Sequence, residues 1–487
     1  MKNYNIGLDF GTYQTKVCIL DIDNDTHEFF RFPSNNSFFL PSKVSLTANG
    51  NFEYGITNNN SKKYFYYFKI ASAEDIEFRL ESFKTDTNNL YNAEEFAPFT
   101  PEFLSVAYLT FVIFTIKEVL KCRQPSEKAT GLLGRLLTQA AEKETISFSI
   151  QLGIPTEWSQ IKNLRRKRKF ESILMIAELL QRKYPTKKDF LNVSTTQLAA
   201  DVKNIYDKIP FSNISEFNNQ LNQLKLSIFP ETAAALSFIL KTKQLKKGYY
   251  AIMDIGGGST DISFFSIVGR NQIKYFASES YIIAGNSVYQ EYKKNRNLNE
   301  SLHEAEENAR FIMDNDLIDE DDVPLIKAIK KVSAELNKLV YKLFYKRVQW
   351  FEISMRQKYE DQQIIVYGGG SRIPGFDEEE VLICDSGARH SITIPQYHMQ
   401  KTHIDNFTFV VNILPADNSW KKDFCVLVVA LGLSYIKPNN LTDWFGDKDY
   451  HPKDGKDPRI KADGGNLIPH PFNEDCFIFD VLASRWR

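Results

Sequence analysis

Residues 249–268 read YYAIMDIGGGSTDISFFSIV, in which a turn of small residues separates two apolar runs. Near the N-terminus, residues 6–22 read IGLDFGTYQTKVCILDI, with the same order of features. Glycine permits the backbone angles that a tight turn between two strands requires, so each stretch predicts a hairpin. Two hairpins of one kind, one in each half of the chain, predict a duplicated α/β fold.

The turns of both hairpins carry residues that suit a phosphate group. Small residues let the backbone approach an anion closely, and successive N–H groups form a nest for phosphate oxygens. Hydroxyl groups add donors, and we expect Lys16 to direct its ammonium toward a β- or γ-phosphate. The candidate phosphate-binding residues are Gly11, Thr12, Tyr13, Lys16, Gly256, Gly257, Gly258, Ser259 and Thr260.

Each hairpin also carries an aspartate just before its turn, Asp9 in the first and Asp254 in the second. Two carboxylates beside a polyphosphate would repel it unless a cation lay between them. Mg²⁺ keeps several waters and takes only a few carboxylate contacts, so it fits this arrangement. We therefore expect Asp9 and Asp254 to hold Mg²⁺ through water.

Two other glycine-rich nucleotide motifs are excluded. A P-loop needs Gly-Lys-Ser/Thr after four spacer residues, and the chain has no such string. The dinucleotide pattern fails because Asp261 occupies the place of its last glycine.

Four segments, in this order, resemble the actin-like ATPase superfamily, which includes actin, DnaK-type heat-shock chaperones, bacterial actin homologues and sugar kinases. They are a phosphate-1 element at 7–12, a phosphate-2 element at 254–261, an adenosine element at 364–374 and a second connecting helix at 426–435. The resemblance covers most of residues 1–437. It implies a two-lobed α/β fold of duplicated ribonuclease-H-like domains with inserted subdomains, and it implies ATP or ADP with Mg²⁺ as ligands.

Within the superfamily the chain is most similar to the nucleotide-binding domain of the DnaK-type chaperones. The similar stretches are LPSKV at 40–44, GIPTEW at 153–158 and SRIP at 371–374. Gly285, with the following asparagine, resembles the Gly-Gly turn after the second phosphate hairpin of that family. The resemblance further implies that Gly368, Gly369, Gly370 and Ser371 face the ribose and adenine.

A catalytic residue is implied by FPETAAAL at 229–236, which resembles the first connecting helix of the family. The acidic residue of that helix positions the attacking water, so Glu231 joins Asp9 and Asp254 as a candidate catalytic residue. The family's Glu-Pro order is reversed here to Pro-Glu, a variant associated with plasmid-segregating actin relatives.

One lysine of the inserted subdomain would correspond to the chaperones' catalytic lysine. Lys69 is a candidate, but no tight motif anchors it, and Lys62, Lys63 and Lys84 are alternatives.

The predicted organisation has three parts. Residues 1–245 form lobe I, with an inserted subdomain at about 35–100 and mostly helix after residue 160. Residues 246–437 form lobe II, with a helical insert at about 287–361 that includes a long helix from Val323 to Tyr359. Residues 438–487 form a polar C-terminal tail.

Bulk properties are those of an ordinary soluble protein. The 487 residues carry a net charge of −1, so no global field attracts nucleic acid or an anionic membrane. The basic run at 165–169 is spread around a helix, and no nucleic-acid partner is expected. Five cysteines without a Cys-x-x-Cys pair predict neither a zinc site nor a disulfide framework.

The chain is expected to be cytoplasmic, without a signal peptide or a transmembrane segment. Its most apolar run, 103–116, falls short of the ~20 residues that cross a bilayer and predicts a buried helix.

The predicted function is an ATP-binding and ATP-hydrolysing conformational switch, resembling the nucleotide-binding domain of DnaK-type chaperones. The standard peptide-binding domain is expected to be missing, because only about 50 residues follow the second connecting helix. A filament-forming bacterial actin-like protein is the alternative, and a small-molecule kinase is a further one. Besides the nucleotide, we expect a protein partner or self-assembly.

Overall fold

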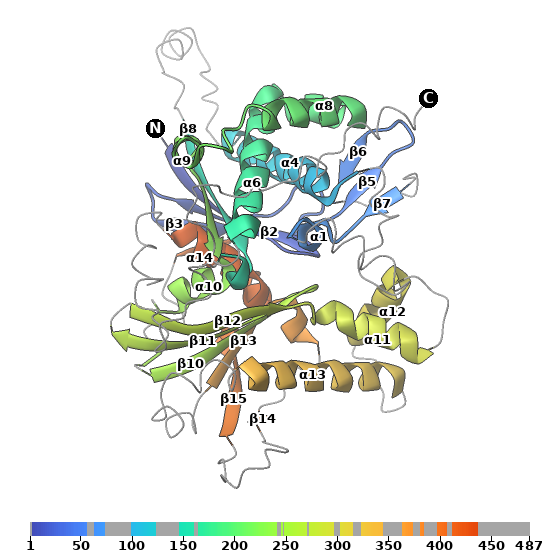
Figure 1. Cartoon of the computed structure of the whole chain (residues 1–487), viewed down its shortest axis with the longest axis vertical. Coiled ribbons are helices and arrows are strands. Elements are labelled where there is room, and N and C mark those ends of the chain that lie inside the picture. Colours follow the sequence, from blue (N-terminus) through green and yellow to red (C-terminus); the bar gives the residue numbers. More distant parts are fainter. Residues whose placement is uncertain are drawn as a thin grey trace.

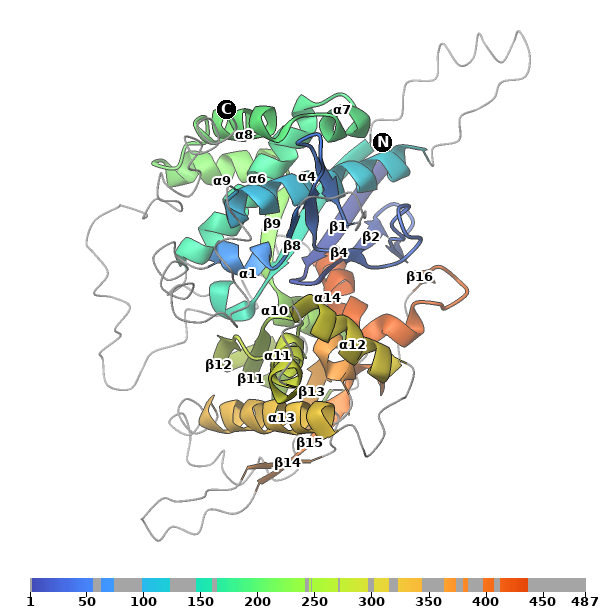
Figure 2. The same ribbon diagram turned by 90° about the vertical axis from the view of Figure 1, so that its right-hand side faces the viewer.

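Two mixed β-sheets, with helices between them and on their outer sides, make up the fold (Figures 1 and 2). The computed structural model describes residues 2–55, 63–73, 99–122, 146–159, 164–240, 245–246, 248–269, 272–296, 302–314, 323–343, 363–373, 380–383, 397–406 and 412–436.

The first sheet has the strand order β16-β3-β2-β1-β8-β9. Strands β1, β2 and β3 are antiparallel neighbours, whereas β8 lies parallel to β1, and β9 parallel to β8. The bounds are β1 Lys2–Phe10, β2 Gln14–Asp21, β3 Thr26–Phe29, β8 Ile146–Ile154, β9 Leu226–Pro230 and β16 Ile413–Leu414, with β4 (Leu40–Pro41) pairing beside β2.

The second sheet has the order β12-β11-β10-β13-β15-β14. Its first five strands in this order repeat the directions of β3, β2, β1, β8 and β9. Strands β10, β11 and β12 are antiparallel neighbours, and β13 and β15 continue the sheet in parallel. The bounds are β10 Gly248–Ile255, β11 Thr260–Gly269, β12 Gln272–Tyr281, β13 Gln363–Tyr367, β14 Glu380–Ile383 and β15 Tyr397–His403. Both predicted hairpins are confirmed, at equivalent places in their sheets.

Successive side chains along a strand point to opposite faces of the sheet, so each sheet contributes residues to two cores. In β1, Ile6, Leu8 and Phe10 face one core, which they share with the outer helices α4 (Pro101–Cys122) and α6 (Leu164–Lys183). The second sheet does the same on its own outer side. Its core residues from β10 and β13 pack against α11 (Gly285–Arg296), α12 (Leu302–Asp314) and α13 (Val323–Leu343).

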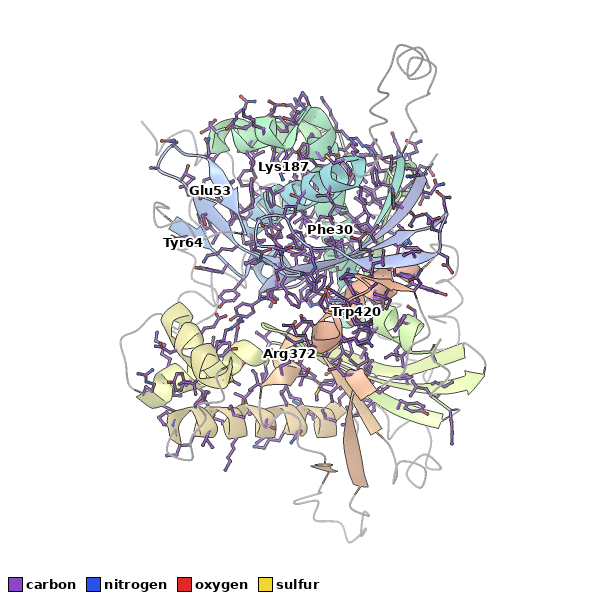
Figure 3. The ribbon with its side chains drawn as sticks, turned by 180° about the vertical axis from the view of Figure 1, so that it is seen from behind. Phe30, Glu53, Tyr64, Lys187, Arg372 and Trp420 are labelled. Atoms are coloured by element: carbon purple, nitrogen blue, oxygen red, sulfur yellow. The ribbon has the colours of Figure 1, made fainter. Side chains whose placement is uncertain are left out.

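Two helices, α10 (Glu231–Ile239) and α14 (Phe424–Tyr435), lie between the sheets (Figure 1). They form one core with the inward-facing residues of both sheets, such as Phe29 of β3 and Ile365 of β13. Trp420, labelled in Figure 3, belongs to this core, with its ring 5.6 Å from that of Phe29.

The remaining described elements surround the first sheet and connect the layers. They are the three-stranded sheet β5 (Val44–Leu46), β6 (Phe52–Tyr54) and β7 (Lys63–Phe65), the helices α1 (Phe68–Ala73), α7 (Lys187–Leu191), α8 (Thr195–Tyr206) and α9 (Ile214–Gln223), and the 3₁₀ turns η1 (Thr156–Ser159), η6 (Gly369–Arg372), η7 (Ile404–Asn406) and η8 (Lys421–Asp423).

The prediction of mostly helix after residue 160 is wrong at one place. Residues 226–230 form β9, which lies parallel to β8. Only five residues long and flanked by helices, this strand shows too little alternation to be separated from them by pattern.

The C-terminal part of the described chain joins the first sheet rather than the second. Strand β16 pairs with β3, although residues 246–437 were assigned to lobe II. The predicted helix from Val323 is described to Leu343; residues 344–359 and the predicted tail at 438–487 lie outside the described residues.

Helix α4 contains the most apolar run of the chain. It is 22 residues long and is the one described helix long and apolar enough to cross a membrane, but 89% of its most apolar window is buried. The prediction of a buried helix is confirmed, and the helix extends beyond the apolar run at both ends.

The basic run at 165–169 begins α6, and part of it packs inward. Arg168 donates from Nη1 to Glu171 Oε2 at 2.6 Å and to Asn218 Oδ1 at 2.8 Å. Lys169 is buried, with its Nζ 3.3 Å from a carboxylate oxygen of Glu102. These two cations stabilise helix packing instead of lying on a solvated face.

We predict that Gly432→Ala lowers the free energy of unfolding by about 1–3 kcal/mol, because a Cβ here would overpack the contact between α14 and α10. It would lie 1.9 Å from the Ala234 carbonyl oxygen. Denaturant titration measures the change. Gly369→Ala is the matched control, because its Cβ would meet nothing within 4 Å, and equal losses in both variants would contradict the prediction.

Candidate functional site

The turns of the two hairpins meet at one cavity of about 330 Å³. Strand β1 contributes Asp9 and β10 contributes Asp254, so the two predicted carboxylates line it from different sheets. The other predicted residues in its lining are Gly11, Thr12, Tyr13, Lys16, Glu231, Gly256, Gly257, Ser259, Gly285, Gly368, Gly369 and Gly370.

Three predicted residues, Gly258, Thr260 and Ser371, do not line the cavity. The Thr260 hydroxyl donates to the Ile283 carbonyl at 2.6 Å, and the Ser371 hydroxyl donates to the Gly368 carbonyl at 2.7 Å. Both hydroxyls therefore fix the local backbone, and neither faces the space that a nucleotide would occupy.

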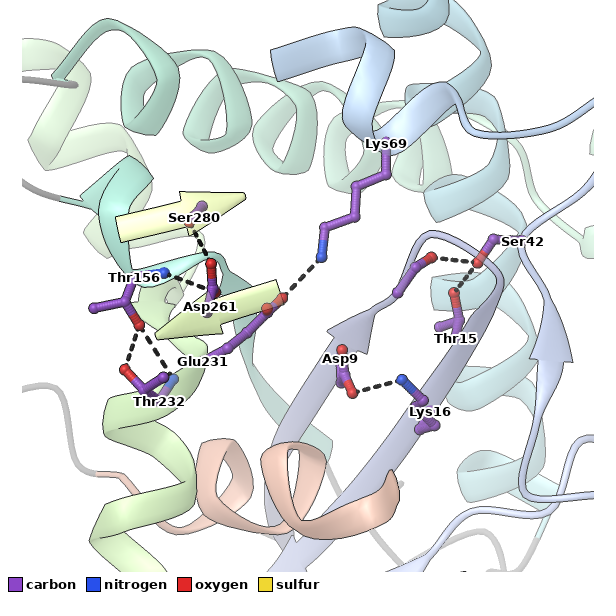
Figure 4. Close-up of polar contacts among 11 residues, drawn as sticks. Asp9, Thr15, Lys16, Ser42, Lys69, Thr156, Glu231, Thr232, Asp261 and Ser280 are labelled. Atoms are coloured by element: carbon purple, nitrogen blue, oxygen red, sulfur yellow. Dashed lines mark hydrogen bonds and ion pairs between the residues drawn. The ribbon is translucent and has the colours of Figure 1, made fainter. Parts of the chain in front are cut away.

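The first turn is held in place by Ser42, which follows β4. Its backbone N–H donates to the Tyr13 carbonyl at 2.7 Å, and its hydroxyl donates to the Gly11 carbonyl at 2.7 Å. Thr15 of β2 completes this group, with its hydroxyl 3.1 Å from that of Ser42 (Figure 4). The carbonyls of the first turn thus point toward Ser42.

The two hairpins have the same register but opposite charges at one position. Asp9 is paired with Lys16 across the first hairpin, and their side chains form a 2.9 Å ion pair. Asp254 is paired with Asp261 across the second hairpin. Asp261, which was not predicted as a site residue, therefore occupies the position equivalent to Lys16.

Asp261 connects the second hairpin to elements around the first sheet. It accepts hydrogen bonds from the Ser280 hydroxyl and from the Thr156 backbone N–H, the latter at 3.2 Å (Figure 4). Thr156 in turn contacts the hydroxyl of Thr232, in the first turn of α10, and accepts its backbone N–H at 3.3 Å. This chain of contacts fixes the start of α10 beside Asp261.

Glu231 begins α10 and pairs with Lys69 of α1. The Lys69 ammonium lies 2.8 Å from Glu231 Oε1, and their side chains are only 5% and 10% exposed (Figure 4). Of the alternative lysines, Lys63 begins β7, while Lys62 and Lys84 lie outside the described residues. Lys69 thus lies in the cavity wall together with both hairpins.

Three acidic side chains of the cavity, those of Glu231, Asp254 and Asp261, have raised pKa values. Burial, and then the charges of Glu231, Asp261 and Asp9, raise the pKa of Asp254 well above its usual value. Burial and the charge of Glu231 raise the pKa of Asp261 to about 7. Burial also raises the pKa of Glu231, although Lys69 opposes it.

The pKa of Lys69 shows the same surplus of negative charge. Burial acts to lower this pKa, but the charges of Glu231, Asp9 and Asp261 outweigh burial and raise it. A lysine whose pKa rises in spite of burial indicates a surplus of negative charge around it.

This charge surplus favours the binding of a divalent cation. Among the described residues, no group of three or more His, Cys, Asp or Glu side chains is placed to hold a metal ion directly. Asp9 and Asp254 could therefore contribute to a Mg²⁺ site only alongside water and phosphate oxygens, which is how Mg²⁺ is commonly held.

The wall near η6 is partly apolar and suits a nucleoside. Ile373, Val426 and Val429 line it, together with glycines 368–370. Arg372, labelled in Figure 3, is tied back to α14, with Nη2 2.9 Å from Asp423 Oδ1 and Nε 3.4 Å from Cys425 Sγ.

Several lining residues were missed from the sequence. Phe39, Tyr289, Arg310, Met313 and Arg372 belong to no local phosphate or metal motif, and among them only Arg310 and Met313 share an element, α12. Only Asp261 had a usable signal, since equal spacing in the two hairpins places it opposite Asp254, as Lys16 lies opposite Asp9.

No protein-family model matches the chain. Among solved structures, it is similar to a non-polymerisable quadruple mutant of pCBH ParM, with 13% identity over 77% of this chain and 92% of that chain and a TM-score of 0.35. It is also similar to a 15-stranded ParM filament from Clostridium botulinum, with 15% identity over 89% of this chain and 99% of that chain and a TM-score of 0.39. Similarities this weak support no conclusion about function. Both are to ParM structures, so the predicted closeness to the DnaK-type chaperones is not shown.

We predict that Asp261→Asn flattens the pH dependence of stability. Folded Asp261 has a pKa of about 7 instead of the usual 3.8, so the folded protein keeps a proton that the unfolded chain releases. Stability is therefore lost as pH rises from about 4 to about 7, and the variant should melt above wild type at about pH 8 but not at about pH 4. Thermal unfolding across this range tests the prediction.

Asp201→Asn is the control, because its effect on stability should change with pH in the opposite direction. Burial acts to raise the pKa of Asp201, but hydrogen bonds from Lys183, Tyr184 and Gln197 lower it overall. This variant should lose stability at neutral pH and approach wild type in acid. Parallel melting curves for Asp261→Asn and wild type would contradict the prediction for Asp261.

Proposed function

We propose that the cavity binds a magnesium-complexed adenine nucleotide and hydrolyses its terminal phosphate, in an actin-like ATPase. The observation that carries this proposal is the meeting of the two glycine turns, each with its aspartate, beside the Lys69–Glu231 pair in one cavity. The order and directions of five strands, which the two sheets share, support a duplicated two-lobed fold, with residues 1–245 and 246–437 as the main parts of the lobes.

The turns would hold the phosphates. Backbone N–H groups of residues 11–13 and 257–259 would donate to phosphate oxygens, and Ser259 would add its hydroxyl. Lys16 would exchange part of its contact with Asp9 for a phosphate oxygen. Mg²⁺, when bound, would neutralise charge on the phosphates beside Asp9 and Asp254.

Glu231 would position and deprotonate the attacking water. Its Oε1 accepts from Lys69, so Oε2 would take the proton from the water. The raised pKa of Glu231 brings this carboxylate closer to the operating pH, where a general base works best. Lys69 would hold the carboxylate in place and offset charge on the transferred phosphoryl group.

The nucleoside would occupy the opposite wall. Glycines 368–370 permit close approach of the ribose and adenine, while Ile373 and Val429 offer apolar contact. A nucleotide bound in this way touches both sheets, so its hydrolysis would change the contacts that hold them together.

We predict that Asp9→Ala and Asp254→Ala each reduce magnesium-dependent ATP turnover by about 100-fold or more, because each removes a carboxylate from the phosphate site. Glu231→Gln should keep nucleotide affinity within a few-fold but slow hydrolysis by about 100-fold, because it removes the base. Phosphate release and binding of a fluorescent adenine nucleotide measure the two effects.

Glu178→Gln is the matched control for Glu231→Gln. Glu178 also forms a buried pair with a lysine, Lys117, at 2.6 Å, but neither residue lines the cavity. It should change stability without changing turnover per folded molecule. Wild-type turnover in Glu231→Gln would remove this residue from the proposed role.

Filament formation is the second candidate function, and the Pro230–Glu231 order favours it. Pro230 caps α10, and Glu231 is its first residue, the variant associated with plasmid-segregating actin relatives. Both similar structures are of ParM proteins, and one of them is a filament.

If the chain forms filaments, we predict that it sediments with ATP and stays soluble with ADP. The reason is that nucleotide state would control the head-to-tail contacts between chains. High-speed pelleting measures this. Asp254→Ala, which should not turn over ATP, is the control for the role of hydrolysis in disassembly. A chain that turns over ATP but never pellets would favour the chaperone-like switch.

A further inference from the structure

A cluster of aromatic rings and one arginine joins the two halves at the wall of the cavity. Tyr13, in the first hairpin turn, meets the ring of Tyr67 edge-on, with centroids 5.4 Å apart and hydroxyl oxygens 3.0 Å apart. The same ring lies against Gly257 of the second turn, where a Cβ would be 1.9 Å from it. Tyr13 is thus held from the first-sheet side and touches the second-sheet side.

Arg310 of α12 reaches this cluster from the second-sheet side. Its guanidinium carbon lies 5.3 Å from the ring centre of Tyr13 and 5.8 Å from that of Tyr289 on α11. Glu306, one helical turn earlier on α12, forms a 2.8 Å ion pair with Arg310. Both distances to the rings are within the range of a cation–π interaction.

The ring of Tyr13 that Arg310 contacts is neutral. Burial, and then the charge of Tyr67, raise the pKa of Tyr13 well above its usual value, so its phenol stays protonated at physiological pH. The Arg310 side chain remains 39% exposed, which leaves one side of the contact open to solvent. A contact of this kind can break and re-form without exposing a hydrophobic core.

Tyr13, Tyr289 and Arg310 all line the nucleotide cavity. Of these, Tyr13 comes from the hairpin of the first sheet, while Tyr289 and Arg310 come from helices that pack on the second. The contact therefore closes part of the cavity wall from both halves.

We propose that Tyr13, Tyr67, Tyr289 and Arg310 form a clasp that must open for the nucleotide to enter or leave. This inference rests on the proposed nucleotide-binding function and adds a positioning role for Arg310. Because the clasp is made by protein side chains alone, it slows entry as well as exit. Its loss should raise the association and dissociation rates together and change the equilibrium affinity little.

The test is stopped-flow measurement of a fluorescent adenine nucleotide with the full chain and Mg²⁺. In Arg310→Ala we expect both rates to rise by about 3- to 30-fold, the range that a partly desolvated cation–π contact supports. Arg310→Lys, which keeps the charge, should rescue part of the effect. Tyr67→Phe, which removes only the 3.0 Å hydroxyl contact to Tyr13, should raise both rates by a smaller factor.

Arg296→Ala is the matched control. Arg296 also packs over a tyrosine, with its guanidinium carbon 5.2 Å from the Tyr292 ring, but both residues belong to α11 and neither lines the cavity. Its rates should stay within about 2-fold of wild type, since a contact within one helix does not join the halves.

Three results would overturn the clasp. Unchanged rates in folded Arg310→Ala and Tyr67→Phe, with wild-type protein binding the nucleotide, would overturn the clasp alone. A rise in the dissociation rate alone, with an equal loss of affinity, would make Arg310 an ordinary ligand contact. Wild-type protein that binds no nucleotide would overturn the proposed function together with the clasp.

Discussion

Buried negative charge is the constraint on which the site depends. Four carboxylates, those of Asp9, Glu231, Asp254 and Asp261, share one cavity with two lysines, while its two arginines pair with acids outside its lining. The fold supplies the hydrogen bonds of Asp261 and the ion pair of Glu231, yet the pKa values of Glu231, Asp254 and Asp261 rise. The cavity is therefore stabilised by anything that brings protons or cations, so binding and stability are linked.

Local patterns were enough to predict the elements that carry the site. Strand alternation and glycine turns located both hairpins, and the resemblance of residues 229–236 to a connecting helix indicated α10. Long-range pairing was beyond such patterns. The five residues of β9 and the two of β16 join the first sheet only because neighbouring strands are already in place, a tertiary effect that no short window contains.

Much of the site was beyond sequence reasoning for a similar reason. Asp261 stands in the most informative stretch of the chain, but its importance comes from the strand register that puts it opposite Asp254. Lys69 could be named only as one lysine among several, because its selection depends on where α1 packs relative to Glu231. Arg310 belongs to a charged helix whose surface pattern gives no reason to prefer it.

The contact between α10 and α14 limits how the molecule can move. At Gly432 the two helices touch backbone to backbone, so no interlocking side chains separate them at that point. Sliding one sheet past the other would pull this contact apart, whereas rotation about it would leave most of the packing intact. The helix pair thus behaves as a pivot, and a small turn there becomes a larger opening at the far rim, where α12 lies.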